Sequence, residues 1–225
     1  MKELVVAIDG PAGAGKSTVA QIVARKLNYT YIDTGAMYRA VTWAALKGSC
    51  SSENIEGVTQ LLQRMDISLK YTEGQLQVCV NGENVTAAIR TPQISRSVSE
   101  YAKLPAVRQA MLIRQRQMAD QGGVVMDGRD IGTHVLPDAE VKIFLTASIA
   151  ERAGRRWREL KGKGFDTDLE QLTHEIAERD RMDSQREIAP LMQAPDAILV
   201  DTTGLTIDAV VETILLIYKE RKKLV

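Results

Sequence analysis

The chain has 225 residues and a formal net charge of zero, from 29 Lys and Arg against 29 Asp and Glu. This length suits a single α/β domain with an insertion, and the lack of a basic excess argues against a general nucleic-acid binder. The apolar run at the N-terminus, Leu4–Ile8, is too short for a signal peptide, and no run approaches the roughly 18 apolar residues of a membrane span. We therefore expect a cytoplasmic protein without a membrane or a stable nucleic-acid partner.

Short apolar runs alternate with longer amphipathic segments along the chain. The runs are rich in β-branched or aromatic residues and are bounded by Gly, Asp or Pro, which is typical of buried strands. The predicted strands are Leu4–Ile8, Tyr29–Ile32, Val124–Met126, Val141–Leu145 and Ala197–Val200. In the last helical segment, apolar residues recur at helical spacing from Ile207 to Tyr218. This alternation predicts an α/β fold with a mostly parallel sheet covered on both faces.

The stretch Asp66–Thr86 breaks this alternation and predicts a small antiparallel insert. Its predicted strands are Ile67–Tyr71, Gln75–Val80 and Glu83–Val85. A turn at Glu73-Gly74 would join the first two strands, and Asn81-Gly82 is a strong two-residue hairpin signal before the third. Two helices are predicted next, at about Ser95–Ala102 and Pro105–Asp120.

A glycine-rich segment follows the first predicted strand and opens a helix. Residues Gly10–Ser17 read GPAGAGKS, a full match to the phosphate-loop pattern GxxxxGK[ST]. Gly13 and Gly15 allow the backbone to curl so that its N–H groups point at phosphate oxygens, and the helix start adds a positive dipole end. We expect Lys16 to reach the β and γ phosphates and Ser17 to bind Mg²⁺. The predicted ATP-binding residues are Gly10, Pro11, Ala12, Gly13, Ala14, Gly15, Lys16, Ser17 and Thr18.

The segment VVMDGRD, Val124–Asp130, helps to decide among classes of phosphate-loop protein. A GTPase would carry an NKxD motif, which is absent, and a recombination or helicase ATPase would end this hydrophobic run in a lone Asp or Asp-Glu. Here Arg129 and Asp130 follow a strand, where α/β sheets bind ligands. The pair suits an acceptor with a phosphate and a polar ring, although a solvated loop with paired charges is the alternative.

Two further segments carry candidate ligand-binding residues. In YIDTGAMYR, Thr34 starts a helix after a strand, so Tyr38 and Arg39 one turn later would face a ligand above the helix start. An ordinary helix cap with a packed Tyr is the alternative. Charged residues also crowd between Ala177 and Pro190, where a surface helix with salt bridges is the alternative. The charged residues of this second segment are Arg179, Asp180, Arg181, Asp183 and Arg186.

A basic segment runs from Arg152 to Lys163 and contains a single acid, Glu159. Phosphoryl transfer needs positive charge that closes over the transferring group and later withdraws. An Arg-rich helix followed by two glycines is typical of such a lid, whereas a solvated basic helix face is the alternative. The predicted lid residues, spaced at i, i+3 and i+4, are Arg152, Arg155 and Arg156.

These motifs together resemble those of the bacterial cytidylate kinase family, and the resemblance covers nearly the whole chain. The segments that carry it include GPAGAGKST, DTGAMYR, the insert before IRTPQIS, DGRDIGT, ERAGRR, ERDRMDSQREIAP and DTTGLTIDAVV. The DGRD segment and the ERD-to-REIAP segment are more specific than the phosphate loop, which adenylate, shikimate and dephospho-CoA kinases share without this set.

The resemblance implies a nucleoside monophosphate kinase fold in a single domain with a five-stranded parallel core sheet. The core would comprise about residues 1–33, 122–150 and 168–225, the acceptor-binding region with its insert about 34–121, and the lid about 151–167. It also implies an acceptor site, and the residues expected to line the CMP site are Thr34, Tyr38, Arg39, Ser99, Arg108, Arg129, Asp130, Arg179, Asp183 and Arg186.

The expected reaction is phosphoryl transfer from Mg-ATP to CMP or dCMP by a monomer. The acceptor phosphate is already anionic, so catalysis would consist of positioning and charge stabilisation by Lys16 and the lid arginines. We assign cytosine reading to Asp130 and Arg108, since a carboxylate accepting from N4 would select against uracil. A kinase for another monophosphate or small metabolite, and a non-catalytic phosphate-loop protein, remain as alternatives.

Overall fold

The computed structural model describes residues 3–72 and 75–224, which divide into two compact units. Unit 1 comprises Met1–Ile32 and Ala119–Val225, and unit 2 comprises Asp33–Met118. The turn predicted at Glu73-Gly74 lies outside the described residues. Within the described ranges, no helix combines the length and the apolar character needed to cross a membrane.

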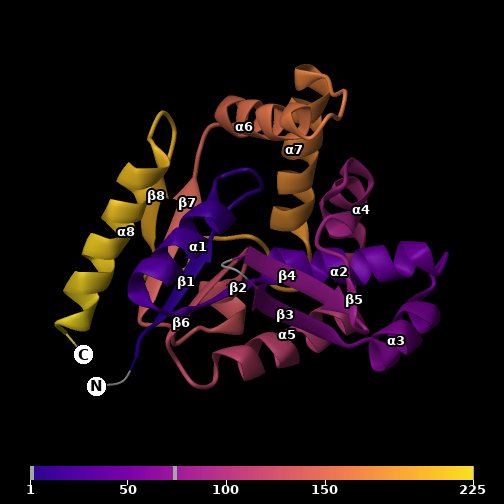
Figure 1. Cartoon of the computed structure of the whole chain (residues 1–225), viewed down its shortest axis with the longest axis horizontal. Helices are drawn as coiled ribbons and strands as arrows, with labels where there is room; N and C mark the ends of the chain where they lie inside the picture. Colours follow the sequence, from indigo (N-terminus) through magenta and orange to yellow (C-terminus); the bar gives the residue numbers. More distant parts are fainter. Residues whose placement is uncertain (1–2, 73–74, 225) are drawn as a thin grey trace. The chain divides into compact units, whose positions relative to one another are not determined.

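A five-stranded sheet forms the centre of unit 1, in the order β2-β6-β1-β7-β8 (Figure 1). Its strands are β1 (Val5–Asp9), β2 (Thr30–Asp33), β6 (Val124–Gly128), β7 (Val141–Thr146) and β8 (Ile198–Asp201). β1 pairs in parallel with β6 on one side and with β7 on the other. From β1 the chain therefore runs to β2 and β6 on one side and later to β7 and β8 on the other, and α/β sheets bind ligands where the strand order reverses in this way.

All five strands predicted from the sequence are confirmed, with ends that move by no more than two residues. β1, β2 and β8 each extend through an aspartate that the apolar pattern did not include. Backbone pairing continues past the last apolar side chain, because ladder hydrogen bonds do not depend on side-chain polarity. Polar residues consequently stand at the carboxyl ends of the strands.

Unit 1 also contains helices, some of which contact this sheet. They are α1 (Lys16–Leu27), α6 (Ile149–Gly162), α7 (Leu169–Gln185), α8 (Ile207–Lys222) and a single π-helical turn, η2 (Ile131–Val135). α1 and α8 lie side by side in Figure 1 and contact each other, and α6 contacts α7. The apolar face predicted for α8 is buried from Val210 to Tyr218, but Ile207 is 50% exposed because it lies in the first turn of the helix, next to the Thr206 cap.

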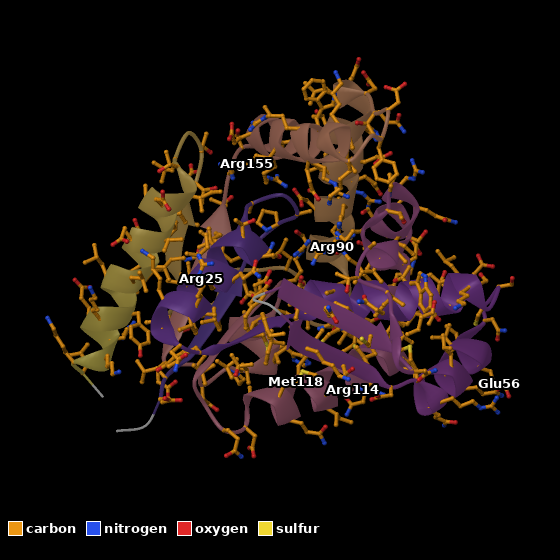
Figure 2. All side chains as sticks on the ribbon, viewed as in Figure 1. Arg25, Glu56, Arg90, Arg114, Met118 and Arg155 are labelled. Carbon is orange, nitrogen blue, oxygen red and sulfur yellow. The ribbon has the colours of Figure 1, made fainter. Side chains whose placement is uncertain are left out.

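Unit 2 combines helices with a three-stranded antiparallel sheet in the order β3-β4-β5. Its elements are α2 (Thr34–Lys47), α3 (Ile55–Arg64), β3 (Ile67–Thr72), β4 (Gln75–Val80), β5 (Glu83–Asn84), the short 3₁₀ helix η1 (Ala88–Arg90), α4 (Pro92–Ala102) and α5 (Pro105–Ala119). Arg114, labelled in Figure 2, ties α5 to the loop after α3 by donating to the Met65 carbonyl at 2.8 Å. The predicted antiparallel insert is confirmed.

The start of α4 differs from the prediction by three residues. The helix begins at Pro92, after Thr91 accepts a hydrogen bond from the Ile94 N–H at 3.4 Å. A threonine cap followed by proline is a favoured helix start, since proline has no N–H to satisfy there. The apolar pattern alone missed this signal.

The hairpin signal at Asn81-Gly82 is confirmed by the backbone. Asn81 has φ 49° and Gly82 has φ 83°, both in the left-handed region that a two-residue turn of this kind requires. A Cβ on Gly82 would meet nothing within 4 Å, so backbone conformation alone makes this position specific for glycine.

We predict that Gly82→Ala lowers the free energy of unfolding by about 1 kcal/mol, because alanine is strained at positive φ. The matched control is Gly154→Ala inside α6, where the new Cβ would come no closer than 3.7 Å to the Arg158 side chain. There the change should raise the free energy of unfolding by about 0.5–1 kcal/mol through helix propensity. Urea denaturation of both variants measures the effects, and equal shifts of the same sign would contradict the prediction.

Candidate functional site

The phosphate loop joins β1 to α1 in the predicted strand–loop–helix context. Gly13 and Gly15 have φ 77° and 88°, so the expected need for glycine is confirmed at both positions. Gly10 packs against β7, where a Cβ would lie 1.9 Å from the Leu145 carbonyl oxygen. A larger residue would clash with β7 at Gly10, and it would be strained by the positive φ at Gly13 and Gly15.

Lys16 is buried at the start of α1, and its Nζ donates to the Pro11 carbonyl at 2.8 Å. Burial lowers the pKa of Lys16 well below its usual value, and the charges of Arg129 and Arg179 lower it further, against the opposing charge of Asp127. Burial and the charge of Arg129 likewise lower the pKa of Arg179 to about 10. Cations gathered in this way repel one another, so the site favours a bound anion.

Asp127, near the end of β6, accepts hydrogen bonds from two hydroxyl groups of unit 1. Its carboxylate accepts from Ser17 Oγ at 3.0 Å and from the Tyr31 hydroxyl at 2.7 Å. A hydroxyl beside a carboxylate offers the hard oxygen atoms that Mg²⁺ prefers, so the residues fit the predicted ion at Ser17. Sequence reasoning did not assign Asp127 to the site, although the apolar run that ends in this aspartate was a usable signal.

Arg152, one of the three predicted lid residues, is buried and bonded to backbone. Its Nε donates to the Ala147 carbonyl and its Nη1 to the Ala12 carbonyl of the phosphate loop, both at 2.9 Å. It also forms an ion pair of 2.6 Å with Asp180 of α7. In this structure the Arg152 side chain therefore holds the phosphate loop through the Ala12 carbonyl.

Arg155 and Arg156, the other two predicted lid residues, form different contacts. Arg155, labelled on α6 in Figure 2, donates to Thr202 Oγ1 at 3.0 Å and to the Thr202 carbonyl at 2.7 Å. Arg156 pairs with Glu159 at 2.7 Å on the same helix. The three arginines thus share a helix, and these contacts join them to different residues.

The acceptor residues predicted in unit 1 are joined by ion pairs, including one of 4.0 Å between Arg179 and Asp183. Arg129 pairs with Asp183 at 2.9 Å, and Arg186 pairs with Asp130 at 2.9 Å. Burial raises the pKa of Asp183, but Arg129, Arg179 and Arg186 together lower it below its usual value. Arg186 also donates to the Ala189 carbonyl at 2.6 Å, which orients its guanidinium toward Asp130. The structure brings all five of these residues into one charged network.

The acceptor residues predicted in unit 2 lie on α2, α4 and α5. Arg39 donates to Ser95 Oγ at 2.9 Å, and the Arg108 guanidinium lies 5.7 Å from the Tyr38 ring centre. Thr34 and Ser99 are both buried. Thr34 follows Asp33, whose carboxylate caps α2 by accepting from the Ala36 N–H at 2.8 Å. This hydrogen bond fixes the first turn of α2, which contains Thr34.

A phosphate loop at the end of a central parallel strand, with buried cations beside it, defines this chain as a nucleotide-binding protein of the P-loop class. The family model for cytidylate kinase matches residues 6–220. A cytidylate kinase from Ligilactobacillus salivarius is 58% identical over 221 residues, which cover 98% of this chain and 99% of that protein. One from Bacillus thuringiensis is 54% identical over 214 residues, covering 95% of each. The chain belongs to the cytidylate kinase family.

A solved structure of an uncharacterized protein from Eubacterium ventriosum is similar in fold. It has a TM-score of 0.51 and 12% identity, covering 95% of this chain and 97% of that one. At this identity the likeness concerns the fold alone, and it agrees with the predicted α/β class.

We predict that Lys16→Ala lowers kcat by at least about a hundredfold, because it removes the charge that is expected to contact the phosphates of ATP. The melting temperature should fall little, since Lys16 is a buried charge repelled by its neighbours. Lys26→Ala on the same helix, where the amine pairs with Glu212 at the exposed surface, is the control and should keep full activity. Near wild-type turnover in Lys16→Ala would rule out the phosphate-loop assignment.

Proposed function

We propose that the chain transfers the γ-phosphoryl group of Mg-ATP to CMP or dCMP, giving ADP and CDP or dCDP. The observation that carries the proposal is that Lys16, in the phosphate loop, lies close enough to Arg129 and Arg179 for their charges to lower its pKa. A donor phosphate at Lys16 and an acceptor phosphate at the two arginines would meet in one field of positive charge. Membership of the cytidylate kinase family supports the choice of a cytosine nucleotide.

ATP would lie on the phosphate loop, with its β and γ phosphates near Lys16 and the N-terminus of α1. Mg²⁺ at Ser17, beside Asp127, would neutralise charge that develops on the phosphates. The acceptor phosphate needs no general base because it is already anionic at neutral pH. Arg39, Arg129 and Arg179 would hold it, which leaves positioning and charge stabilisation as the chain's contributions to rate.

Base reading would rest on Asp130, with Arg108 donating to N3 and O2 of cytosine. The Arg186–Asp130 ion pair supports this role, because it keeps a carboxylate in one orientation. Ser99 and Asp183 would hold the sugar. The cytoplasmic location and the monomeric state expected from the sequence stay predictions.

The direct test is ADP formation measured across CMP, dCMP, UMP and AMP with Mg-ATP. CMP and dCMP should support turnover far better than UMP or AMP. Preference for another monophosphate would move the chain to a different specificity, and ATP hydrolysis that no acceptor stimulates would contradict a transfer reaction.

We predict that Arg155→Ala and Arg156→Ala lower kcat by about tenfold or more and change the KM for CMP less than about twofold. The reason is that a lid arginine is proposed to contact the transferring group only as the transition state forms, which for Arg155 requires release from Thr202. Arg158→Ala, at an exposed position of α6, is the control. A raised KM with an unchanged kcat would identify a static binding surface instead.

We predict that Asp130→Asn narrows the preference for CMP over UMP by at least about tenfold in kcat/KM. Uracil presents an acceptor where cytosine has its N4 amine, so a carboxylate there repels UMP, and a buried unpaired polar group costs about 1–3 kcal/mol. An amide supplies a donor of nearly the same shape. The measurement is kcat/KM for both nucleotides, and equal impairment of both would assign Asp130 a role outside base reading.

A further inference from the structure

Asp9, the last residue of β1, has a buried carboxylate that neither the family resemblance nor the proposed reaction uses. Oδ1 accepts from the Ile131 N–H at 2.8 Å, and Oδ2 accepts from the Gly132 N–H at 2.7 Å. These two residues directly follow Asp130 and form the start of η2. One carboxylate on the central strand therefore accepts from the first two N–H groups of η2, the turn that directly follows the proposed base-reading residue Asp130.

The turn itself depends on this anchor. Asp130 precedes η2 without a side-chain cap of its own, and its backbone has φ −143° and ψ 28°. The first N–H groups of a helical turn have no partner within it, and here Asp9 supplies their acceptors from another strand. The Asp130 carbonyl is also used within the turn, by the N–H groups of His134 and Val135 at 2.9 and 3.1 Å. The Asp130 backbone is thus fixed by hydrogen bonds to its own carbonyl and to the two N–H groups that follow it.

The position of Asp9 in the chain links this anchor to the phosphate loop. Asp9 pairs with Gly128 of β6, the residue before Arg129, and it immediately precedes Gly10. Gly10 in turn packs against the Leu145 carbonyl of β7, which fixes the strand end. The start of the phosphate loop and the acceptor-binding turn are consequently bonded to the same residue.

We propose that Asp9 is a positioning residue for the acceptor: its ionised carboxylate holds the turn that carries Arg129 and Asp130, and so sets acceptor affinity and base choice without touching substrate. The inference rests on the proposed function, since it assigns Asp9 to the same acceptor. It differs from a purely structural role because it predicts a selective effect on the acceptor and a dependence on the charge of Asp9.

The charge of Asp9 is sensitive to pH in an accessible range. Burial raises the pKa of Asp9 to about 6, helped by the charge of Asp130 and opposed by the two backbone hydrogen bonds and by Lys16. On β7, the stem of Lys142 lies near Gly132 while its amine pairs with Asp196 at 2.8 Å. Because the folded pKa lies above the usual carboxyl value, the ionised form carries a cost to folding that the neutral form avoids.

The first test compares Asp9→Asn with wild type at pH 8 in steady-state kinetics. The amide keeps one acceptor but places an NH₂ group against a backbone N–H. We expect the KM for CMP to rise at least about tenfold and the preference for CMP over UMP to narrow, since small displacements of a binding group are costly, while the KM for ATP changes less than about threefold. Equal rises in both KM values, or no rise in either, would overturn the proposal.

Glu140→Gln is the matched control. Glu140 also accepts a backbone N–H of β1 through its carboxylate, from Val5 at 2.9 Å, but at the opposite end of the strand. It should leave both KM values unchanged. An acceptor-selective effect in Glu140→Gln as large as that in Asp9→Asn would mean that any carboxylate hydrogen-bonded to a backbone N–H near β1 has the same effect, and it would overturn the assignment to Asp9.

The second test follows the same ratio with pH. Asp9→Asn resembles the protonated carboxyl, so the advantage of wild type in kcat/KM for CMP should shrink from about tenfold at pH 8 toward parity at pH 5.5. The acceptor phosphate itself titrates near about pH 6, but it does so in both proteins and cancels from the ratio. A ratio that stays constant across this range would overturn the charge dependence.

A third measurement needs no variant, in case Asp9→Asn does not fold. Cytidine lacks the phosphate, so calorimetric titration of wild type with cytidine avoids the acceptor's own ionisation. If only the form with ionised Asp9 binds well, affinity at pH 5.5 should be about fourfold weaker than at pH 8. Equal affinity would overturn the proposal. ADP formation by wild type with CMP at pH 8 tests the proposed function separately, so failure of the two ideas is distinguishable.

Discussion

The charged site of unit 1 is constrained by mutual repulsion among Lys16, which is buried, and Arg129 and Arg179, which are partly buried. After burial itself, the charge of Arg129 is the next cause of the lowered pKa of both Lys16 and Arg179. Buried charges of one sign are costly unless counter-charges lie nearby. Asp127 and Asp183 supply part of that compensation, and a bound polyphosphate would supply more. The positive charge of the site therefore favours anion binding even without a ligand.

The phosphate loop of the same site is held through its backbone carbonyls. Arg152 holds the Ala12 carbonyl of the phosphate loop, and Thr202 Oγ1 lies 3.4 Å from the Ala14 carbonyl. Because these hydrogen bonds use carbonyl groups of the loop, its N–H groups stay available for a ligand. Since Arg152 belongs to α6, the helix proposed to carry the lid is connected directly to the loop that would hold ATP.

Much of the fold was predictable because it follows from local pattern. Apolar runs of strand length located all five parallel strands, and Asn81-Gly82 located the hairpin of unit 2, whose positive φ values few residue pairs accept. Strand ends and the start of α4 were less accurate. Backbone pairing continues through polar residues such as Asp9, and a Thr-Pro cap is visible only when capping is considered together with periodicity.

The sequence by itself determined the phosphate loop, the class of fold and the family, because each depends on residue types at short, regular spacing. Only the tertiary structure decided the partners of individual charged groups. Asp9 accepts from Ile131 across 122 residues, and Arg152, a predicted lid residue, donates to the Ala12 carbonyl across 140 residues. Such pairings follow from which strands lie next to each other in the sheet, and strand order is a property of the folded chain that no local pattern contains.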